Sequence, residues 1–517
     1  MTQTHGPAPD DFERRNAAAV QAMNEGRYPA ALAILRQVGA LWPGALQIHG
    51  NLGNVAAHHL SWPDCFVRYR RALAIDARNP VVHLMLGTAE LQCGQLTPGM
   101  KTLRRAIQLR PGYSSAYANL GIAFLTAQNP REAELHLRKA IEFDRNHIAA
   151  RASLIRALRE QWQLPDAVVE ARKTIALAPS TVPALLELAN VELAMGEVQS
   201  AVRGNRRALD CEPDHLVATS SYLFNLRFDP NVGAEAVAQA HLKLGRRVAA
   251  RALREARTPF KGWSRSTPLR VGFVSSDFRR TPASWFLMSA LASRKPGSWQ
   301  AICYADVPVG DAVTDRLRSH ADLWRMIPGW TDEHLAATIA ADRIDVLFDL
   351  SGHAAGSRLS LYARRAAPIQ VTWLGYNDTT GIPNMDFILA DRFVIPPGEE
   401  RHFGERVVRL RDGFVCYSPP DYAPPVAPLP SLSRGYFTFG CFGQLAKVTD
   451  EVLQNWERIL ARTPGSRLAL LSPGLDEPGL RARFRERLAR NGIPLDRVEI
   501  KRLPSIRNPS RCTPIPT

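Results

Sequence analysis

Apolar and small residues recur at a spacing of 34 positions through the first two-fifths of the chain. Large apolar residues form one column, glycines form the next, and small residues form two more. A fifth column, which is rich in proline, marks the end of each repeat. The columns are Leu52, Leu86, Leu120, Leu154, Leu188 and Tyr222; Gly53, Gly87 and Gly121; Ala31, Cys65, Gly99, Ala133, Ala167 and Ala201; Ala72, Ala106, Ala140 and Ala208, interrupted by Thr174; and Pro43, Ala77, Pro111, Arg145, Pro179 and Pro213. Columns that keep one period predict a series of stacked helical hairpins.

The columns of small residues explain how the two helices of each hairpin can pack closely. A leucine or tyrosine of one helix fills the space that a small residue leaves on the other. Proline at the end of a repeat stops the second helix, so the next hairpin starts there. The period is that of tetratricopeptide repeats, and it predicts about six of them over residues 16–225. Because stacked repeats enclose a concave groove, we expect a protein or peptide ligand there.

The pattern changes after Tyr222. Residues 226–268 predict a helical linker, with one helix at 234–257 and then a polar connector. Over residues 269–416, short apolar runs alternate with helix-like stretches, which indicates a parallel α/β sheet. The predicted strands are LRVGFVSSDF, IDVLFDLSGH, APIQVTWLGY and MDFILADRF, and predicted helices lie at 311–321 and 332–341. Polar residues follow these strands, at the carboxyl edge where open α/β sheets bind their ligands.

A second strand series begins at GYFTFGCF and continues through a predicted helix at 450–462, SRLALLSP, a helix at 480–491 and RVEI. A proline-dense linker at 417–435 precedes it and is expected to be extended and fairly stiff. We therefore predict two Rossmann-type lobes, at 269–416 and 436–517, with an active site in the cleft between them. The second lobe is expected to be incomplete, because few residues follow Gly435 and the ending 501–517 has no periodicity.

Composition narrows the class of protein. A chain of 517 residues is too long for a single core. The N-terminal residues lack the apolar stretch of a signal peptide, and no apolar run is long enough to cross a bilayer. The seven cysteines are scattered without a CxxC pair, which favours a reducing cytoplasm over disulfides or zinc. The net charge of +16 comes mainly from arginines spread over helical faces without interleaved aromatics, which argues against nucleic acid as a partner.

The motifs as a set resemble a known family. The helical repeats, followed by RVGFVSSDF, DLSGHAAGSRL, AAPIQVTWLGY and FGCFGQLAKVTDEVLQNWERIL, are similar to protein O-linked N-acetylglucosamine transferases of the bacterial and SPINDLY type. The resemblance covers nearly the whole chain, from roughly residue 16 to residue 500. It implies a two-lobed GT-B-type glycosyltransferase that moves a sugar from a nucleotide sugar to Ser or Thr of a protein. It also implies that the helical superhelix guides the acceptor polypeptide.

The resemblance suggests roles for four residues. Gln444 and Lys447, in GQLAK, match the segment that meets the nucleotide diphosphate, where a lysine would stabilise the charge that the leaving group gains. The alternative for Lys447 is a surface lysine that caps the next helix. His353, at the end of DLSGH, is a candidate to face the sugar or a structural histidine. Asp277, in SSDF, is a candidate to orient a donor or acceptor hydroxyl, or to cap the following helix.

One further segment, with residues 373–376 and 379–381, resembles a cleft loop, although its aromatic residues could equally belong to the core. Two positions depart from the family pattern. The family has a histidine shortly after the Asp-Phe of the first strand and another four residues later, whereas this chain has Thr281 and Trp285. Threonine cannot replace a general base, because it has no usable proton affinity near neutral pH. The Gly/Thr-rich turn that would hold the diphosphate at a helix start is also absent after Lys447.

Three hypotheses follow from these observations. The first is an inverting, metal-independent transferase that uses no cofactor, takes UDP-GlcNAc as donor, and holds a protein acceptor in the groove of the repeats. The second is a catalytically impaired or inactive peptide-binding superhelix with a truncated transferase lobe. The third is a related transferase whose donor is GDP-fucose or UDP-glucose. Each hypothesis places the chain in the cytoplasm, with neither a membrane nor a nucleic acid as partner.

Overall fold

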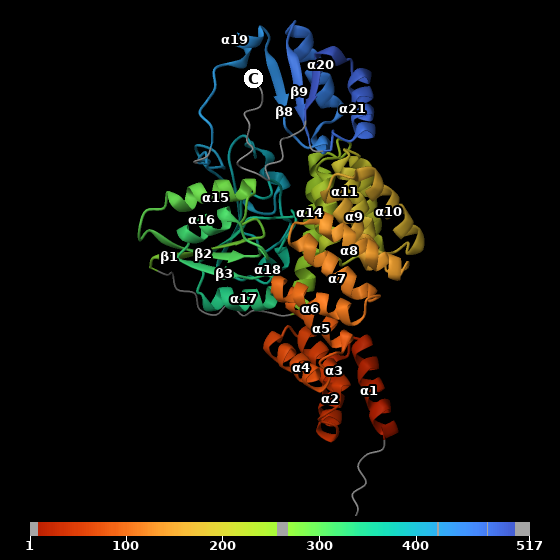
Figure 1. Ribbon diagram of the computed structural model, residues 1–517. Helices are drawn as coiled ribbons and strands as arrows, with labels where there is room; N and C mark the ends of the chain where they lie inside the picture. Colours follow the sequence, from red (N-terminus) through yellow and green to blue (C-terminus); the bar gives the residue numbers. More distant parts are fainter. Residues whose placement is uncertain (1–8, 256–266, 421–422, 473, 502–517) are drawn as a thin grey trace, which may run out of the picture. The chain divides into compact units, whose positions relative to one another are not determined.

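The computed structural model describes residues 9–255, 267–420, 423–472 and 474–501 (Figure 1). The predicted helix end at 257, the N-terminal residues 1–8 and the ending 502–517 lie outside these ranges. The chain divides into two compact units, which are Met1–Ser153 with Ile327–Thr331, and Leu154–Met326 with Asp332–Thr517. None of the described helices combines the length and the apolarity that a bilayer span requires.

The first unit consists of antiparallel helical hairpins. Its helices are α1 (Pro9–Asn24), α2 (Tyr28–Leu41), α3 (Leu46–His58), α4 (Trp62–Ile75), α5 (Pro80–Gln92), α6 (Leu96–Leu109), α7 (Ser114–Thr126) and α8 (Pro130–Phe143). The helices α2, α4, α6 and α8 each end two positions before the proline-rich column. This confirms that the column marks the point where the second helix of each repeat stops.

The glycine column sits where paired helices approach most closely. A Cβ atom built on Gly53 would lie 2.5 Å from a ring carbon of Tyr69, and one built on Gly121 would lie 2.6 Å from Cγ of Leu137. Both partners are buried, at 2% and 0% exposure. A side chain in place of either glycine would therefore push the helices apart, at a typical cost of about 1–3 kcal/mol. The predicted packing of large residues against small ones is confirmed in these hairpins.

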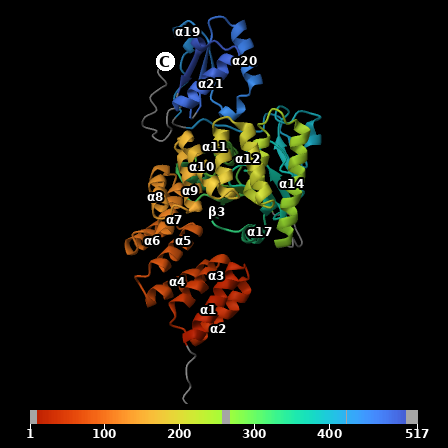
Figure 2. The same ribbon diagram turned by 90° about the vertical axis from the view of Figure 1, so that its right-hand side faces the viewer.

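The second unit begins with the same architecture. Helix α9 (Ile148–Glu160) spans the division at Ser153, and the helices that follow are α10 (Leu164–Leu177), α11 (Val182–Ala194), α12 (Val198–Cys211), α13 (Leu216–Leu226) and α14 (Ala234–Glu255). Figure 2 shows α11 and α12 side by side, with α14 beyond them. Hairpin packing thus continues up to the point where the 34-residue period fails.

A seven-stranded sheet with parallel pairing throughout follows in the second unit, in the order β3-β2-β1-β4-β5-β6-β7. The strands are β1 (Leu269–Ser275), β2 (Trp299–Ala305), β3 (Leu323–Met326), β4 (Val346–Asp349), β5 (Ile369–Thr372), β6 (Phe387–Ala390) and β7 (Arg406–Arg409). The four predicted strands correspond to β1, β4, β5 and β6, which confirms the parallel α/β class. In this order the chain moves outward from β1 to β3 and returns to β4 on the other side of β1, which makes the carboxyl ends of β1 and β4 a topological switch point.

Helices cover both faces of this sheet. They are α15 (Pro282–Ala292), α16 (Ala312–His320), α17 (Asp332–Ala341) and the short α18 (Leu359–Ala363). Figure 1 shows α15 and α16 on one side of strands β1–β3 and α17 on the other. Phe273 of β1 packs with Leu287 of α15 and Leu317 of α16 in one buried cluster. The core therefore lies between the sheet and its helices and leaves the strand ends to polar loops.

The second strand series forms a separate parallel sheet in the order β10-β9-β8 within the described residues. Its elements are α19 (Pro430–Arg434), β8 (Thr438–Cys441), α20 (Asp450–Arg462), β9 (Arg467–Leu471), α21 (Pro478–Arg490) and β10 (Val498–Lys501). Each of the two connecting helices starts at a side-chain cap. Thr449 accepts from the Val452 amide at the start of α20, and Glu477 accepts from the Gly479 amide at the start of α21.

Candidate functional site

The loop after β1 holds Asp277 at the switch point. Its backbone amide donates to Ser275 Oγ at 2.9 Å, and its carbonyl accepts from the hydroxyls of Thr281 and Ser284. The carboxyl group is half-buried and makes no hydrogen bond or ion pair within the described residues. Burial raises its pKa, against the opposing charge of Arg279. Asp277 therefore presents a partly desolvated carboxyl group at the edge where a ligand is expected.

Helix α15 is capped by a different residue. Thr281 accepts from the Ser284 amide at 3.4 Å and is the N-cap of α15, so Asp277 does not fill this role. Trp285, one turn further on, packs against the core between the sheet and its helices. The two positions that the family resemblance associates with histidine thus carry a helix cap and a partly buried aromatic residue.

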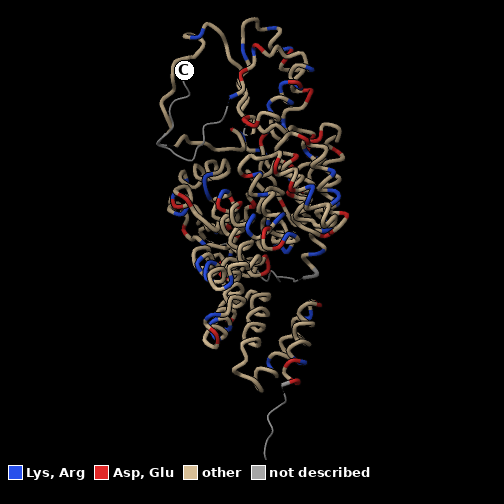
Figure 3. Tube along the Cα trace, turned by 45° about the vertical axis from the view of Figure 1, so that its right-hand side comes forward, with Lys and Arg blue, Asp and Glu red and all other residues tan. Residues whose placement is uncertain are grey.

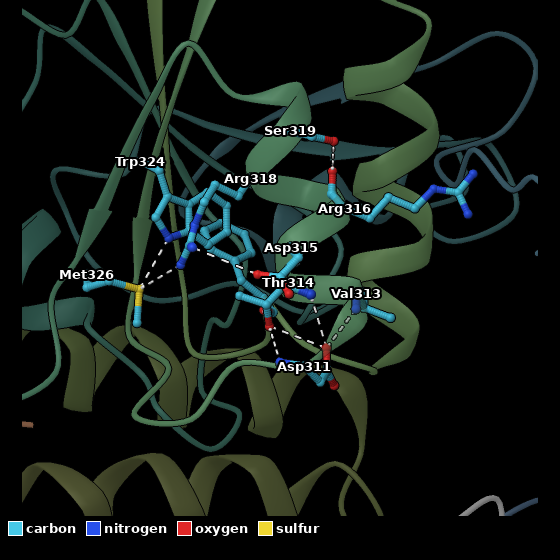
Figure 4. Close-up of polar contacts among 10 residues, drawn as sticks. Asp311, Val313, Thr314, Asp315, Arg316, Arg318, Ser319, Trp324 and Met326 are labelled. Carbon is cyan, nitrogen blue, oxygen red and sulfur yellow. Dashed lines mark hydrogen bonds and ion pairs between the residues drawn. The ribbon is translucent and has the colours of Figure 1, made fainter. Parts of the chain in front are cut away.

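The loop that contains Asp277 is fixed by hydrogen bonds to the start of α16, where Figure 4 shows the contacts of Asp311 with Val313 and Thr314. The Asp311 carboxylate accepts from the amides of Val313 at 2.9 Å and Thr314 at 3.0 Å, which caps the helix. Its second oxygen accepts from the Arg280 amide at 2.8 Å, and Thr314 Oγ1 donates to the carbonyl of Phe278 at 2.7 Å. Because these bonds tie Phe278 and Arg280 to a rigid helix terminus, the backbone that follows Asp277 is held in place.

The loop after β4 is organised around a buried carboxylate. Asp349 is 1% exposed and accepts from the amides of Ser351 at 3.1 Å and Gly352 at 2.9 Å, and from Thr372 Oγ1 at 3.0 Å. Burial raises its pKa to about 6, although these hydrogen bonds oppose the shift. Gly352 has a φ of +53°, a conformation that glycine adopts at little cost. The carboxylate thus fixes the turn that leads into His353.

His353 is 2% exposed, and both ring nitrogens have protein partners. Nε2 lies 2.9 Å from the Thr380 carbonyl, which can only accept, so Nε2 carries the proton. Nδ1 then accepts from the hydroxyl of Ser220 on α13 at 3.1 Å. Burial lowers the pKa to about 3, and the positive charge of Arg227 acts in the same direction. The imidazole is neutral and links helix α13 to the loops of the sheet.

A second buried histidine, His241 of α14, joins that helix to the loop after β5. His241 Nδ1 lies 2.7 Å from the Val237 carbonyl, so Nδ1 carries the proton and Nε2 accepts from the Tyr376 hydroxyl at 2.7 Å. Burial lowers the pKa of His241 as well. The Arg227 guanidinium lies 4.3 Å from the Tyr376 ring centroid and forms an ion pair of 3.2 Å with Asp378. The loop after β5 is therefore tied to helices α13 and α14 by polar groups.

The segments 373–376 and 379–381 belong to the buried framework. Trp373 is 8% exposed and Tyr376 is 2% exposed. Glu405 is also buried and accepts from the hydroxyl of Thr379 at 2.6 Å and from the amide of Thr380 at 2.7 Å. The core alternative for the aromatic residues agrees with this placement. The chain turns here around an internal carboxylate.

Gln444 and Lys447 lie after β8 in the second sheet. The short 3-10 helix Leu445–Lys447 buries Leu445 and Ala446, while Gln444 and Lys447 are exposed. A Cβ atom built on Gly196, in the turn between α11 and α12, would lie 3.3 Å from Leu445 Cβ. Thr449 caps the next helix, so Lys447 does not. In the described part of the chain, Lys447 has no hydrogen bond or ion pair through its ammonium group.

The candidate residues therefore fall into two groups. Asp277 and His353 lie in loops at the carboxyl edge of the seven-stranded sheet, and Gln444 and Lys447 lie after the first strand of the three-stranded sheet. No hydrogen bond or ion pair joins the two groups within the described residues. Sequence reasoning missed Ser220, His241, Asp349 and Glu405. The motif DLSGH contains Asp349 and could have identified it, whereas the other three are brought to the site only by the tertiary fold.

Comparisons with known proteins identify relatives over most of the chain. The sequence model of glycosyl transferase family 41 matches residues 223–418. The probable UDP-N-acetylglucosamine–peptide N-acetylglucosaminyltransferase SPINDLY of Oryza sativa subsp. japonica is 33% identical over 307 residues, which are 58% of this chain and 33% of that protein. The protein of the same name from Arabidopsis thaliana is 38% identical over 237 residues, or 45% of this chain and 26% of that protein. The chain thus spans a quarter to a third of the length of these relatives.

Among solved structures, a mutant O-GlcNAc transferase of Thermobaculum terrenum is similar to this chain with a TM-score of 0.68 and 30% sequence identity. The match covers 76% of this chain and 74% of that one. It includes helical repeats as well as the α/β region, so the likeness extends to the order of the parts along the chain.

Proposed function

Because the chain belongs to glycosyl transferase family 41, we propose that it is a glycosyltransferase that moves N-acetylglucosamine from UDP-GlcNAc to a Ser or Thr of a protein acceptor. The observation that carries this proposal is the match to the O-GlcNAc transferase fold over 76% of the chain at 30% identity. The parallel sheet supports it, because its switch point places Asp277 and the Asp349 turn where open α/β sheets bind ligands.

In this proposal, Lys447 and Gln444 bind the diphosphate of the donor. Both side chains are exposed, while their neighbours Leu445 and Ala446 anchor the segment. An unpaired ammonium group on an anchored turn can stabilise the negative charge that the leaving diphosphate gains. The acceptor hydroxyl attacks the anomeric carbon directly, the bond to the diphosphate oxygen breaks, and the configuration inverts. Asp277 is the candidate that receives the hydroxyl proton, because its half-buried carboxyl group has a raised pKa.

His353 has a supporting place in the proposal. Both of its nitrogens are engaged, by Ser220 and Thr380, so it has no free lone pair for a substrate proton. We assign it to holding the loop after β4 against α13. This placement agrees with the alternative that His353 is a structural histidine.

The acceptor is assigned to the groove of the repeats. In the first unit, a cavity of about 630 Å³ is lined by the polar side chains of Asn54, Thr88 and Asn119 and by the aromatic rings of Trp62 and Tyr69. Asn119 Nδ2 donates to Thr88 Oγ1 at 2.7 Å, which leaves its carbonyl oxygen available to an acceptor amide. Polar amides beside aromatic rings suit an extended peptide with occasional apolar side chains.

A second candidate function is a peptide-binding protein without transferase activity. Thr281 as a helix cap and Trp285 as a partly buried aromatic residue favour it, since neither can serve as a general base. The donor also stays a proposal, with GDP-fucose and UDP-glucose as alternatives. No group of three or more His, Cys, Asp or Glu side chains is arranged to hold a metal in the described ranges, and the reaction without metal or cofactor stays a prediction. The cytoplasmic location likewise stays a prediction from the cysteine pattern.

The test uses the full chain in calorimetry with UDP, UDP-GlcNAc, UDP-glucose and GDP-fucose, and then in transfer to a Ser/Thr-containing peptide library. Lys447→Ala is expected to weaken donor binding at least about tenfold, which corresponds to about 1.4 kcal/mol. The matched control is Lys295→Ala, which changes an exposed lysine in the loop before β2, at the amino edge of the seven-stranded sheet. Peptide binding without donor binding would support the second function. Donor binding that is unchanged in Lys447→Ala would contradict the proposed site.

A further inference from the structure

A cavity of about 310 Å³ opens among α12, α13 and α14 in the second unit. Its floor is apolar and aromatic, with Leu209, Tyr222 and Leu244 among the lining residues. None of these side chains belongs to the loops of the candidate site. The cavity therefore has no role in the proposed transfer reaction.

The rim of this cavity carries an excess of positive charge. Arg206 and Asp210 lie one turn apart on α12 and form an ion pair of 3.5 Å, and the Arg206 guanidinium lies 6.0 Å from the Tyr222 ring centroid. Arg247 of α14 donates to the carbonyl of Pro213 and to the carboxylate of Asp214, each at 3.0 Å. Both guanidinium groups are thus oriented by the chain itself, so little side-chain entropy is lost when they bind a ligand.

Lys243 completes the rim. It lies on α14 one turn before Arg247, its side chain is exposed, and its ammonium group has no partner within the described residues. Between Glu235 and Glu255 the helix has no acidic residue. Among the residues whose burial is described, the exposed basic ones are Arg203, Arg206 and Arg207 on α12, and Lys243, Arg246 and Arg247 on α14. Figure 3 shows Lys and Arg in blue and Asp and Glu in red along the chain.

We propose that this cavity is a docking site for an acidic segment of a partner polypeptide. In the complex, a carboxylate of the segment pairs with Lys243 and Arg206, and a neighbouring bulky apolar side chain packs over Tyr222 and Leu209. The cavity is complementary to such a segment, because it sets the ammonium group of Lys243, which has no partner within the described residues, directly beside an apolar floor. A free phosphate would pair with the basic groups of the rim and leave the apolar floor uncovered. A single-stranded nucleic acid would need a row of aromatic platforms, and among the lining residues Tyr222 is the only aromatic one.

The test measures fluorescence anisotropy of a labelled peptide, Gly-Glu-Phe-Glu-Gly, with the full chain. Lys243→Glu and Arg206→Glu are each expected to weaken binding at least about tenfold, since each replaces an attraction with a repulsion. Lys295→Glu is the matched control, because it changes the net charge equally at an exposed site away from the cavity, and binding should stay within about twofold. Circular dichroism spectra check that each variant keeps the native fold.

Two variant peptides separate the contribution of the carboxylates from that of the apolar side chain. Replacing both glutamates with glutamine should abolish binding, and replacing the phenylalanine with alanine should weaken it. The proposal is overturned if the native chain does not bind the first peptide, if all three variants lose affinity equally, or if inorganic phosphate or a DNA strand displaces the peptide at the same concentration as unlabelled peptide. Since no donor or transfer is measured, these outcomes are independent of the proposed enzymatic function.

Discussion

The hydrogen bond between Tyr376 and His241 gives a sharp test of how the helices are joined to the sheet. The Tyr376 hydroxyl donates to His241 Nε2 at 2.7 Å, and the two side chains are 2% and 0% exposed. In Tyr376→Phe the ring remains, but Nε2 loses its donor in a place that water does not reach. The tautomer cannot adjust, because Nδ1–H is held by the Val237 carbonyl. The perturbation is thus a single buried acceptor without a partner.

The expected magnitude follows from that loss. A buried polar group left without its partner costs about 1–3 kcal/mol. His241→Leu removes the acceptor of the Tyr376 hydroxyl instead and should cost a similar amount, together with the lost bond from His241 Nδ1 to the Val237 carbonyl. In the double variant neither polar group is left unsatisfied, so its loss should be smaller than the sum of the two single losses. We expect a coupling free energy of about 0.5–3 kcal/mol.

The assay is urea unfolding of the four proteins at neutral pH, followed by circular dichroism and by tryptophan fluorescence. Neutral pH is suitable because burial lowers the pKa of His241, so the ring is uncharged. Strictly additive losses, or a loss below about 0.5 kcal/mol in Tyr376→Phe, would show that this bond does not hold α14 to the loop after β5.

Three further variants test separate features of the structure. His353→Gln should flatten the decline of the unfolding free energy between about pH 6.5 and pH 3. The folded pKa of His353, about 3, lies below the ordinary value of 6.5, so the unfolded chain takes up the proton first as the pH falls. The stability contributed by His353 is therefore complete above pH 6.5 and falls by up to about 1.4 kcal/mol per pH unit below it, which urea titrations across this range measure. Asn205→Leu should raise the unfolding free energy by about 1–3 kcal/mol, since both side-chain amide atoms of Asn205 are buried without a hydrogen-bond partner. Asn119→Leu should lower the unfolding free energy, because it removes the hydrogen bond to Thr88. Equal effects of the two variants would refute the difference between a satisfied and an unsatisfied amide. Gly381→Ala should lower the melting temperature more than Gly398→Ala. Both glycines have a positive φ, of +68° and +95°, so both variants are strained. Only at Gly381 would the added Cβ atom also meet the backbone of α14.

The helical repeats could be predicted from the sequence because their contacts are local. Gly53 and Tyr69 belong to one hairpin, so the requirement for a small residue opposite a large one repeats with the hairpin length. The strands β1, β4, β5 and β6 were visible as apolar runs before polar loops. By contrast, β3 and β7, with sequences LWRM and RVVR, are only four residues long and carry arginines, as strands at the edges of a sheet can.

The sequence predicted that candidate site residues lie at the ends of strands, but it did not predict their hydrogen-bond partners. The position of Asp277 follows from a β-strand and its polar end, which a linear pattern can show. That Thr281, and not Asp277, caps α15 depends on the backbone conformation of the loop. The state of His353 depends on Ser220, which is 133 positions earlier in the chain. No spacing rule connects residues on a repeat helix and a sheet loop.

The sequence by itself determined the architecture, which is a series of 34-residue hairpins followed by parallel α/β units. Hydrophobic periodicity fixes secondary structure and its class, because burial of one face is decided within a few residues. Only the tertiary structure decided the chemistry. It made His353 and His241 neutral, raised the pKa of Asp349 to about 6, and left Lys447 exposed. These properties arise from desolvation and from partners distant in sequence, which act on a side chain only after the chain has folded around it.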